Sequence, residues 1–324
     1  MVTRSFSRRH FAKLAGGLGA SVVLPGAPAA FAGQLNHGAG KLVLQPFVNA
    51  PFPYHGKLPN SDVDFLDAMS GNRRGHTSQR GGIYWEDTTY SDNRVLLALP
   101  KGFDVEAQAA IVVYFHGNGA TLERDVLRRQ AVVDQLQDSG LNAALVAPQF
   151  AVDALDSSAG RFWRPGAFAA FMEEAAARLA TLCGASGARR IFEAAPIVLV
   201  AYSGGYDPAA YVLAADDDGK RLKGVVLLDG VFGEEDKFAS WIVRHHKSAF
   251  FFSAFSPSAA DGNNALEALL TSKGIRFSPG LPSKLAVGTV AFLAAPREVN
   301  HNDFVTSAWE DRPLQSVLAR VALG

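Results

Sequence analysis

The chain has 324 residues, of which 48% are hydrophobic, so it is long enough to bury one large core or two ordinary ones. Lys and Arg together number 31, as do Asp and Glu, and the formal net charge is zero. This balance argues against a nucleic-acid partner and against a polybasic membrane patch. The single cysteine, Cys183, excludes an intrachain disulfide.

The first 32 residues have the parts of an export signal. The pair Arg8-Arg9 precedes an apolar run over residues 14–24, and the segment closes on Ala30-Phe31-Ala32, a small-x-small cleavage pattern. An arginine pair before a weakly hydrophobic, glycine-bearing run resembles a twin-arginine signal. That resemblance implies the twin-arginine export machinery as a partner, cleavage after Ala32 and a periplasmic or secreted product. The run is too short to span a bilayer, so we expect no permanent membrane anchor.

Turn-forming residues dominate the next segment, and regular elements are expected after it. Residues 33–80 are rich in Pro, Gly, Asn and Ser, which predicts a loop-rich extension. We expect a catalytic domain over residues 81–324, with a possible cap or loop insertion near 147–168. Its first two predicted strands, 82–86 and 94–100, are expected to form a hairpin.

Unbroken apolar runs then alternate with amphipathic helical patterns. Strands are predicted at 110–117, 141–148, 195–203, 222–230, 248–255 and 286–295. Helices are predicted at 121–140, 167–182, 206–215, 238–246 and 265–274, with one more after the last strand. Continuously apolar strands alternating with helices are typical of a mostly parallel sheet that is covered on both faces.

A serine stands at the end of one predicted strand, where the following residues open a helix. The stretch reads Ala201-Tyr202-Ser203-Gly204-Gly205, a small-x-Ser-x-Gly pattern with alanine at the position that glycine usually holds. Small neighbours are needed there because the serine at such a corner adopts a strained backbone. A simple turn is the alternative interpretation. The place after a buried strand favours Ser203 as a nucleophile.

Glycines also follow the predicted strand at 110–117. The turn His116-Gly117-Asn118-Gly119 can present a backbone N–H, from Asn118 or Gly119, to a developing oxyanion. Gly204, directly after the serine, would supply the second donor. His116 is expected to hold this loop by hydrogen bonds.

A histidine and an acid complete the set. His301 lies in the loop after the final strand, where a neutral imidazole can take the serine proton and later return it. Asp229 ends an apolar strand at the carboxyl edge of the sheet, where active sites of open α/β folds are built. Asp261 is the alternative acid, although N-capping of a helix also explains its position. No spacing such as H-E-x-x-H occurs, so no metal site is predicted.

Ser203, Asp229 and His301 in this order, with the glycine-rich turn at 116–119, resemble the α/β-hydrolase superfamily. The resemblance extends from about Gly82 to the C-terminus. It implies an α/β fold with a mostly parallel central sheet of about eight strands and helices on both faces. It also implies an acyl-enzyme intermediate and no cofactor.

Five residues near the expected nucleophile are candidates for the substrate pocket. Gln149, Phe150 and Trp163 lie in the long connection that follows a strand, and Tyr202 and Tyr206 flank Ser203. Aromatic side chains here can form an apolar wall, with ordinary packing as the alternative. Gln149 is expected either to reach the oxyanion region or to tie down its loop.

The residues therefore predict an exported serine hydrolase that cleaves a small-molecule or lipid-like carboxylic ester. An amidase or an acyltransferase would use the same three residues. A non-catalytic ligand-binding protein on the same fold is the remaining alternative, because a fold alone does not establish a function.

Overall fold

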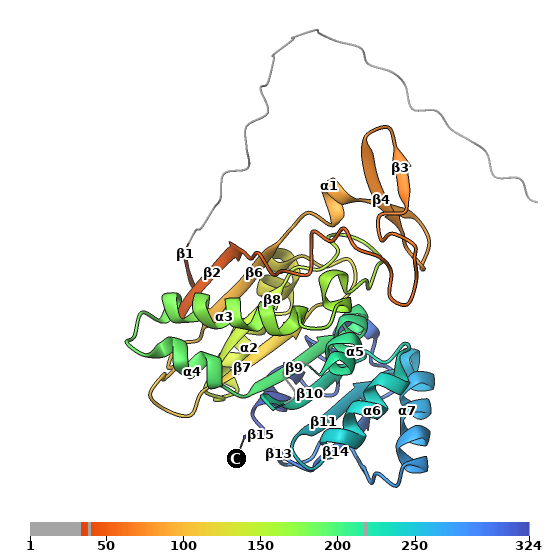
Figure 1. The fold of residues 1–324 in the computed structure, drawn as a ribbon. Helices are drawn as coiled ribbons and strands as arrows, with labels where there is room; N and C mark the ends of the chain where they lie inside the picture. The colour runs from red at the N-terminus through yellow and green to blue at the C-terminus, as the bar shows by residue number, and fades with distance from the viewer. Residues whose placement is uncertain (1–33, 38–39, 217–219, 324) are drawn as a thin grey trace, which may run out of the picture. The chain divides into compact units, whose positions relative to one another are not determined.

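The computed structural model describes residues 34–37, 40–216 and 220–323 (Figure 1). The predicted export signal, residues 1–32, lies outside the described residues. No helix in the described part of the chain is long and apolar enough to cross a membrane.

Ten strands of the described residues form one mixed sheet. In spatial order they are β1 (Gln34–His37), β2 (Gly40–Pro46), β6 (Arg94–Leu99), β8 (Ala143–Pro148), β7 (Ala110–Phe115), β9 (Ile197–Tyr202), β10 (Leu222–Leu228), β11 (Phe250–Phe255), β14 (Val290–Ala294) and β12 (Ser278–Pro279). The pairings from β8 to β12 are parallel, and those among β1, β2, β6 and β8 are antiparallel. The predicted mostly parallel sheet is confirmed, with antiparallel strands at one side.

Helices cover both faces of this sheet (Figure 1). On one face lie α3 (Ala167–Cys183), α4 (Ala188–Ala194), α5 (Tyr206–Ala215), α6 (Glu235–His245) and α7 (Ala260–Ser272). On the other face lie η1 (Leu122–Arg129), α2 (Val132–Asp138) and α8 (Pro313–Leu318). Short turns of helix complete the set: α1 (Glu86–Thr89), η2 (Gly160–Trp163), η3 (Ser203–Gly205), η4 (Pro257–Ala259) and η5 (His301–Asp303).

The apolar strands form two cores because successive side chains of a strand point to opposite faces. In β9, for example, Leu199 packs with the α3–α7 face and Val200 with the opposite face, and both are fully buried. A strand that is covered on both faces needs apolar residues at every position. That requirement explains the unbroken runs in the sequence.

Three expectations about local structure are wrong. The segment β5 (Ile83–Trp85) does not form a hairpin with β6 but joins β3 (Ala68–Ser70) and β4 (Arg73–Thr77) in a separate small sheet. The predicted loop-rich extension contributes β2 to the main sheet, paired with β6. These pairings join segments far apart in sequence, so local composition does not report them.

The third expectation was one continuous helix over 121–140. Instead, a π-helical stretch, η1, ends before Ala131, which has a left-handed backbone (φ 47°), and α2 begins after it. A second small sheet pairs β13 (Leu285–Ala286) with β15 (Val321–Ala322) near the C-terminus.

Strand register decides which side chains meet at the carboxyl edge of the sheet. Phe115 of β7 is level with Ala201 of β9, and Tyr202 of β9 is level with Leu228 of β10. The residues that follow these strands therefore emerge together. Strand order also reverses beside β7, whose successors β8 and β9 lie on its two sides, and such switch points are where ligands bind in open α/β sheets.

A glycine substitution tests the packing at this edge. A Cβ atom added to Gly205 would lie 2.5 Å from the backbone oxygen of Phe115 in β7, which cannot move without disturbing the sheet. We expect Gly205→Ala to lower the free energy of unfolding by about 1–3 kcal/mol, measured by urea denaturation. Gly230→Ala is the matched control, because its added Cβ would have no neighbour closer than 3.5 Å. Equal stability of the two variants would contradict the close approach.

Candidate active site

Ser203 lies at the sharp turn between β9 and α5. Its backbone is left-handed, with a φ of 51°, a conformation that strains a residue with a side chain. Its Cβ is 2.8 Å from where Gly117 would carry a Cβ, so the turn after β7 passes directly over the serine. Glycine at position 117 is therefore needed for this approach. The side chain of Ser203 is held in place while 9% of the residue remains accessible.

His301 reaches Ser203 from η5, at the far end of the chain. Its Nε2 is 2.6 Å from the Oγ of Ser203, and its Nδ1 is 2.6 Å from Oδ2 of Asp229. Because an ionised carboxylate only accepts hydrogen bonds, Nδ1–H donates to Asp229 and Nε2 accepts from the serine hydroxyl. The hydroxyl of Tyr202 donates to the His301 carbonyl oxygen at 3.1 Å, and its ring stacks on the imidazole.

Asp229 is fully buried at the end of β10 and is held by hydrogen bonds on both oxygens. Oδ1 accepts from the backbone N–H of Ser256 at 2.7 Å, and Oδ2 accepts from the hydroxyls of Ser256 and Ser258. The alternative acid, Asp261, is exposed in the first turn of α7, where its charge suits the helix dipole. The structure therefore places Asp229, and not Asp261, against His301.

The chain Ser203–His301–Asp229 can transfer a proton. As the serine oxygen attacks an electrophile, Nε2 is placed to accept its proton, and the buried carboxylate stabilises the resulting imidazolium. This geometry suits acyl transfer to the serine.

His116 and Gln149 form a buried network beside the site. Nδ1–H of His116 donates to the Gly117 carbonyl, while its Nε2 accepts from the Phe150 backbone N–H at 2.9 Å and from the Gln149 amide at 3.0 Å. Burial lowers the pKa of His116, which keeps the imidazole neutral as this pattern requires. The expectation that His116 holds the turn is confirmed.

Gln149 itself is fully buried, and its pocket assignment is wrong. Its Oε1 accepts from the Leu122 N–H, and its Nε2 donates to the carbonyl oxygens of Ala120 and Phe150 besides His116. With its amide engaged in this way, it ties down the loop, the second of the two roles expected for it.

Gly119 and Asn118, both expected to donate to the oxyanion, have different hydrogen-bond partners. The backbone N–H of Gly119 donates to the Ala154 carbonyl at 2.8 Å, so its assignment as an oxyanion donor is wrong. Asn118 lies beside Gly204, whose added Cβ would be 2.0 Å from the Asn118 Oδ1. The Ser157 hydroxyl donates to that same Oδ1 at 3.1 Å. Because Oδ1 is fixed on the side of Ser157, the amide Nδ2 of Asn118 points away from Ser157.

The Nδ2 of Asn118 is buried, and within the described residues it has no acceptor. A buried donor without a partner is costly in a folded protein and is a sign of function. The N–H of Gly204 lies at the start of the helical turn η3, where backbone donors lack intrahelical acceptors.

The other pocket candidates divide into two groups. Phe150 is 5% exposed and packs against Phe115 and Phe162 in the core, and Tyr202 supports His301. Tyr206 and Trp163 line a cavity of about 380 Å³. For these two residues the structure agrees with the expected position.

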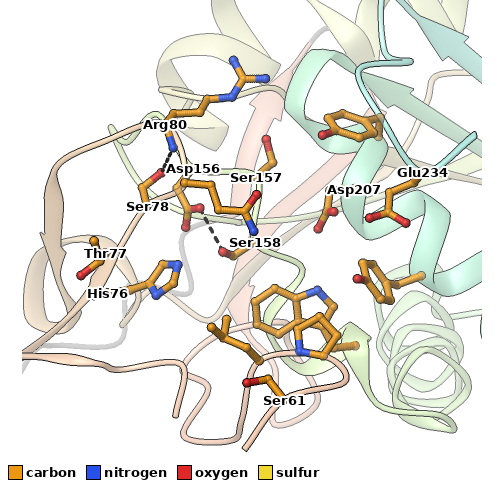
Figure 2. A pocket seen from close by; sticks show the side chains of 16 residues that line it. Ser61, His76, Thr77, Ser78, Arg80, Asp156, Ser157, Ser158, Asp207 and Glu234 are labelled. Carbon is orange, nitrogen blue, oxygen red and sulfur yellow. Dashed lines mark hydrogen bonds between the residues drawn. The ribbon is translucent and has the colours of Figure 1, made fainter. Parts of the chain in front are cut away.

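The cavity is built from three segments (Figure 2). The N-terminal extension supplies Leu58, Pro59, Ser61, His76, Thr77, Ser78, Gln79 and Arg80. The loop after β8 supplies Asp156, Ser157, Ser158 and Trp163, and the α5–α6 region supplies Tyr206, Asp207, Tyr211 and Glu234. The extension thus forms one side of the cavity, which its composition did not indicate.

Three carboxylates line the cavity, and Asp207 is the least compensated. Asp156 accepts hydrogen bonds from Tyr90 and Ser158, and Glu234 pairs with Lys237. Burial, reinforced by the charges of Glu234 and Asp156, raises the pKa of Asp207 to about 7. A carboxyl group with a strongly raised pKa in a cavity is typical of a functional site.

Sequence reasoning did not identify Asp207, Glu234, Ser157 or the pair Ser256 and Ser258. Asp207 reads as an ordinary first-turn helix residue, and the serines read as turn and N-cap residues. Ser256 has two roles: its hydroxyl donates to Asp229, and as an N-cap it also accepts from the Ser258 N–H. The described residues hold no group of three or more His, Cys, Asp or Glu side chains arranged as metal ligands.

No protein-family model matches the chain, and no curated protein matches it. Among solved structures it is similar to an uncharacterized protein from Bacillus cereus, with 13% identity and a TM-score of 0.40 over 63% of this chain; it spans 58% of that protein. It is also similar to an IroE-like serine hydrolase from Shewanella oneidensis (18% identity, TM-score 0.42, 65% of this chain and 71% of that one). It is similar as well to a feruloyl esterase module from Clostridium thermocellum (14% identity, TM-score 0.42, 84% of this chain and 98% of that one).

The fold is assigned from the arrangement of strands, helices and site residues in this chain. A mostly parallel sheet with helices on both faces places a serine at a strand–turn–helix corner, and its partners follow in the order Asp229, His301. This is the arrangement of the α/β-hydrolase fold.

The raised pKa of Asp207 predicts how stability depends on pH. Because its pKa rises from 3.8 to about 7 on folding, its contribution is fully present below about pH 4 and is lost as the pH rises through 7. Asp207→Asn removes this dependence. We expect the melting temperature of the variant, relative to wild type, to increase between about pH 5 and pH 8. The exposed Asp261→Asn is the control, and a pH-independent difference for Asp207→Asn would contradict the electrostatics of the cavity.

Proposed function

We propose that the protein is a serine hydrolase that cleaves carboxylic esters through an acyl-enzyme intermediate. The observation that carries this proposal is the continuous hydrogen-bonded chain from the Ser203 hydroxyl through His301 to the buried Asp229. Its support is geometric: both links are 2.6 Å long, and the serine lies at a strand–turn–helix corner with a left-handed backbone.

In the first half of the reaction, the Ser203 Oγ attacks the ester carbonyl carbon while His301 Nε2 takes the hydroxyl proton. Asp229 stabilises the imidazolium that forms. The tetrahedral intermediate then expels the alkoxide oxygen of the ester, which leaves as the alcohol with the proton from His301. The acyl group remains bonded to Ser203.

In the second half, water repeats the sequence in place of the serine. His301 takes a proton from water as the water oxygen attacks the acyl carbon, and then returns that proton to the Ser203 oxygen as the carboxylic acid leaves. The side chain of His301 is about one third exposed, so water has access to it.

The oxyanion is stabilised by the Gly204 backbone N–H and by Asn118. Asn118 offers its buried amide Nδ2, which has no acceptor among the described residues, and Ser157 orients that amide through Oδ1. Donors that are fixed before the reaction stabilise developing charge at no cost in reorganisation.

An amidase or an acyltransferase would use the same triad, and the choice depends on whether water or another nucleophile accepts the acyl group. A non-catalytic binding protein is disfavoured, because such a protein has no need of a serine, a histidine and a buried acid joined by hydrogen bonds. We further propose that the protein is exported by the twin-arginine route and acts in the periplasm or outside the cell. This rests on Arg8-Arg9 and on the cleavage pattern that ends at Ala32.

The triad is tested by covalent labelling and by turnover. We expect a fluorophosphonate probe to label wild-type protein at Ser203, and Ser203→Ala to abolish both labelling and hydrolysis of p-nitrophenyl esters. Asp229→Asn should lower kcat by about 10⁴-fold, because the imidazole loses the acceptor that fixes its tautomer. Asp261→Asn, which removes an exposed acid instead, should leave kcat unchanged. Folded wild-type protein that neither labels nor turns over would refute the proposed hydrolase.

Asn118→Ala tests the side-chain donor. Loss of one oxyanion donor should reduce kcat by about 10²–10³-fold with little change in KM. Ser157→Ala should cause a smaller loss, because Asn118 keeps its amide but loses its orientation. Asn264→Ala, at an exposed position in α7, is the control for an asparagine truncation. An unchanged kcat in Asn118→Ala would remove the amide from the mechanism.

A further inference from the structure

Two contacts link the cavity to the active site. Ser157 lines the cavity and also contacts Asn118, next to the nucleophile. On the other side, the Phe232 ring contacts both His301 and the cavity residue Tyr206, with ring centroids 5.7 and 6.0 Å apart. The cavity thus lies one contact away from Asn118 and one ring away from His301, within reach of one end of a substrate whose ester lies at Ser203.

Of the three carboxylates that line this cavity, only Glu234 forms an ion pair with another described residue. Three acids line it, and the basic groups near them are Arg80 and Lys237. Lys237 already pairs with Glu234, and its ammonium lies 4.9 Å from the centre of the Tyr211 ring. Arg80 is exposed at the rim, with its guanidinium over the Phe232 ring. Asp207 forms no ion pair with either Lys237 or Arg80, and its pKa stays raised although the charge of Lys237 lowers it in part.

A carboxylate that is largely removed from water normally has a cation beside it. Burial and the charges of Glu234 and Asp156 raise the pKa of Asp207 more than the charge of Lys237 and the Trp163 indole N–H lower it. The cavity therefore has an excess of negative charge that a cationic ligand would offset.

Three aromatic rings also contribute to the walls. Trp163, Tyr206 and Tyr211 all line the cavity, and Tyr211 already faces the ammonium of Lys237. The faces of Trp and Tyr rings attract cations through their quadrupole, most strongly where water is excluded. A carboxylate beside such rings is an arrangement suited to an organic ammonium group. The described acids are not arranged as metal ligands, so a metal ion is not the expected occupant.

We propose that this cavity selects esters that carry a cationic organic group, an ammonium or trimethylammonium, which binds beside Asp207 and against the rings of Trp163 and Tyr206. The proposal rests on the proposed ester hydrolysis at Ser203 and names its substrate class. It also accounts for an acid retained where it destabilises the free protein, because the ligand supplies the missing positive charge.

A matched pair of ligands tests the proposal. Choline and 3,3-dimethylbutanol have the same shape and differ by the positive charge, and so do acetylcholine and 3,3-dimethylbutyl acetate. We expect choline to bind the Ser203→Ala protein at least about tenfold more tightly than the alcohol, measured by calorimetry. For wild type, kcat/KM should favour the cationic acetate by a similar factor.

Asp207→Asn should abolish this preference, whereas the exposed Asp261→Asn should keep it. Choline has no titratable ammonium, so its affinity should rise as the pH increases through about 7, where Asp207 ionises among Glu234, Asp156, Lys237 and Tyr206. Thermal melting of Asp207→Asn confirms that the variant is folded.

The outcomes separate this proposal from the hydrolase proposal. If Ser203 labels with fluorophosphonate but neither choline nor acetylcholine is preferred, the protein remains a hydrolase and the cationic pocket is refuted. A preference that survives in Asp207→Asn would also refute it. If choline binds through Asp207 but Ser203 neither labels nor turns over, the pocket is supported and the hydrolase is not.

Discussion

The left-handed backbone of Ser203 is the constraint on which the active site depends. It turns the chain from β9 into α5 so sharply that neighbouring residues must have no side chain: a Cβ at Gly117 would lie 2.8 Å from that of Ser203, and one at Gly205 would lie 2.5 Å from the Phe115 oxygen. Such strain costs about 1–3 kcal/mol and persists only where surrounding packing fixes it. Here, buried strands covered by helices on both faces provide that packing.

The same turn brings together residues that the chain keeps far apart. Register places the ends of β7, β9 and β10 beside one another, so Gly117, Ser203 and Asp229 meet at one edge. His301 arrives from nearly 100 residues later and is fixed on one side by Asp229 and on the other by Tyr202. Asp229 in turn depends on Ser256 and Ser258 after β11. Each group is thus held by a different strand end, which gives the site its rigidity.

The cavity combines polar groups that are satisfied within the protein with one acid that is not. Most of its polar groups are satisfied within the protein, as Asp156 is by Tyr90 and Ser158. Asp207 departs from this pattern, since burial and neighbouring acids raise its pKa to about 7. Proteins keep such costs mainly where a ligand or a reaction repays them. The N-terminal extension encloses this side of the molecule through residues 58–80, so it belongs to the site and not only to the surface.

The sequence by itself determined the alternation of elements and the order Ser203, Asp229, His301, because these depend on local patterns: apolar runs, the small residues around the serine, and polar residues at strand ends. Only the tertiary structure decided the choice of Asp229 over Asp261, the engagement of Gly119 and Gln149 in the loop network, and the partnership of β2 with β6. It also brought Asp207 together with Asp156 and Trp163. These contacts join segments distant in sequence, and no local spacing encodes which distant side chain will satisfy a given hydrogen bond or charge.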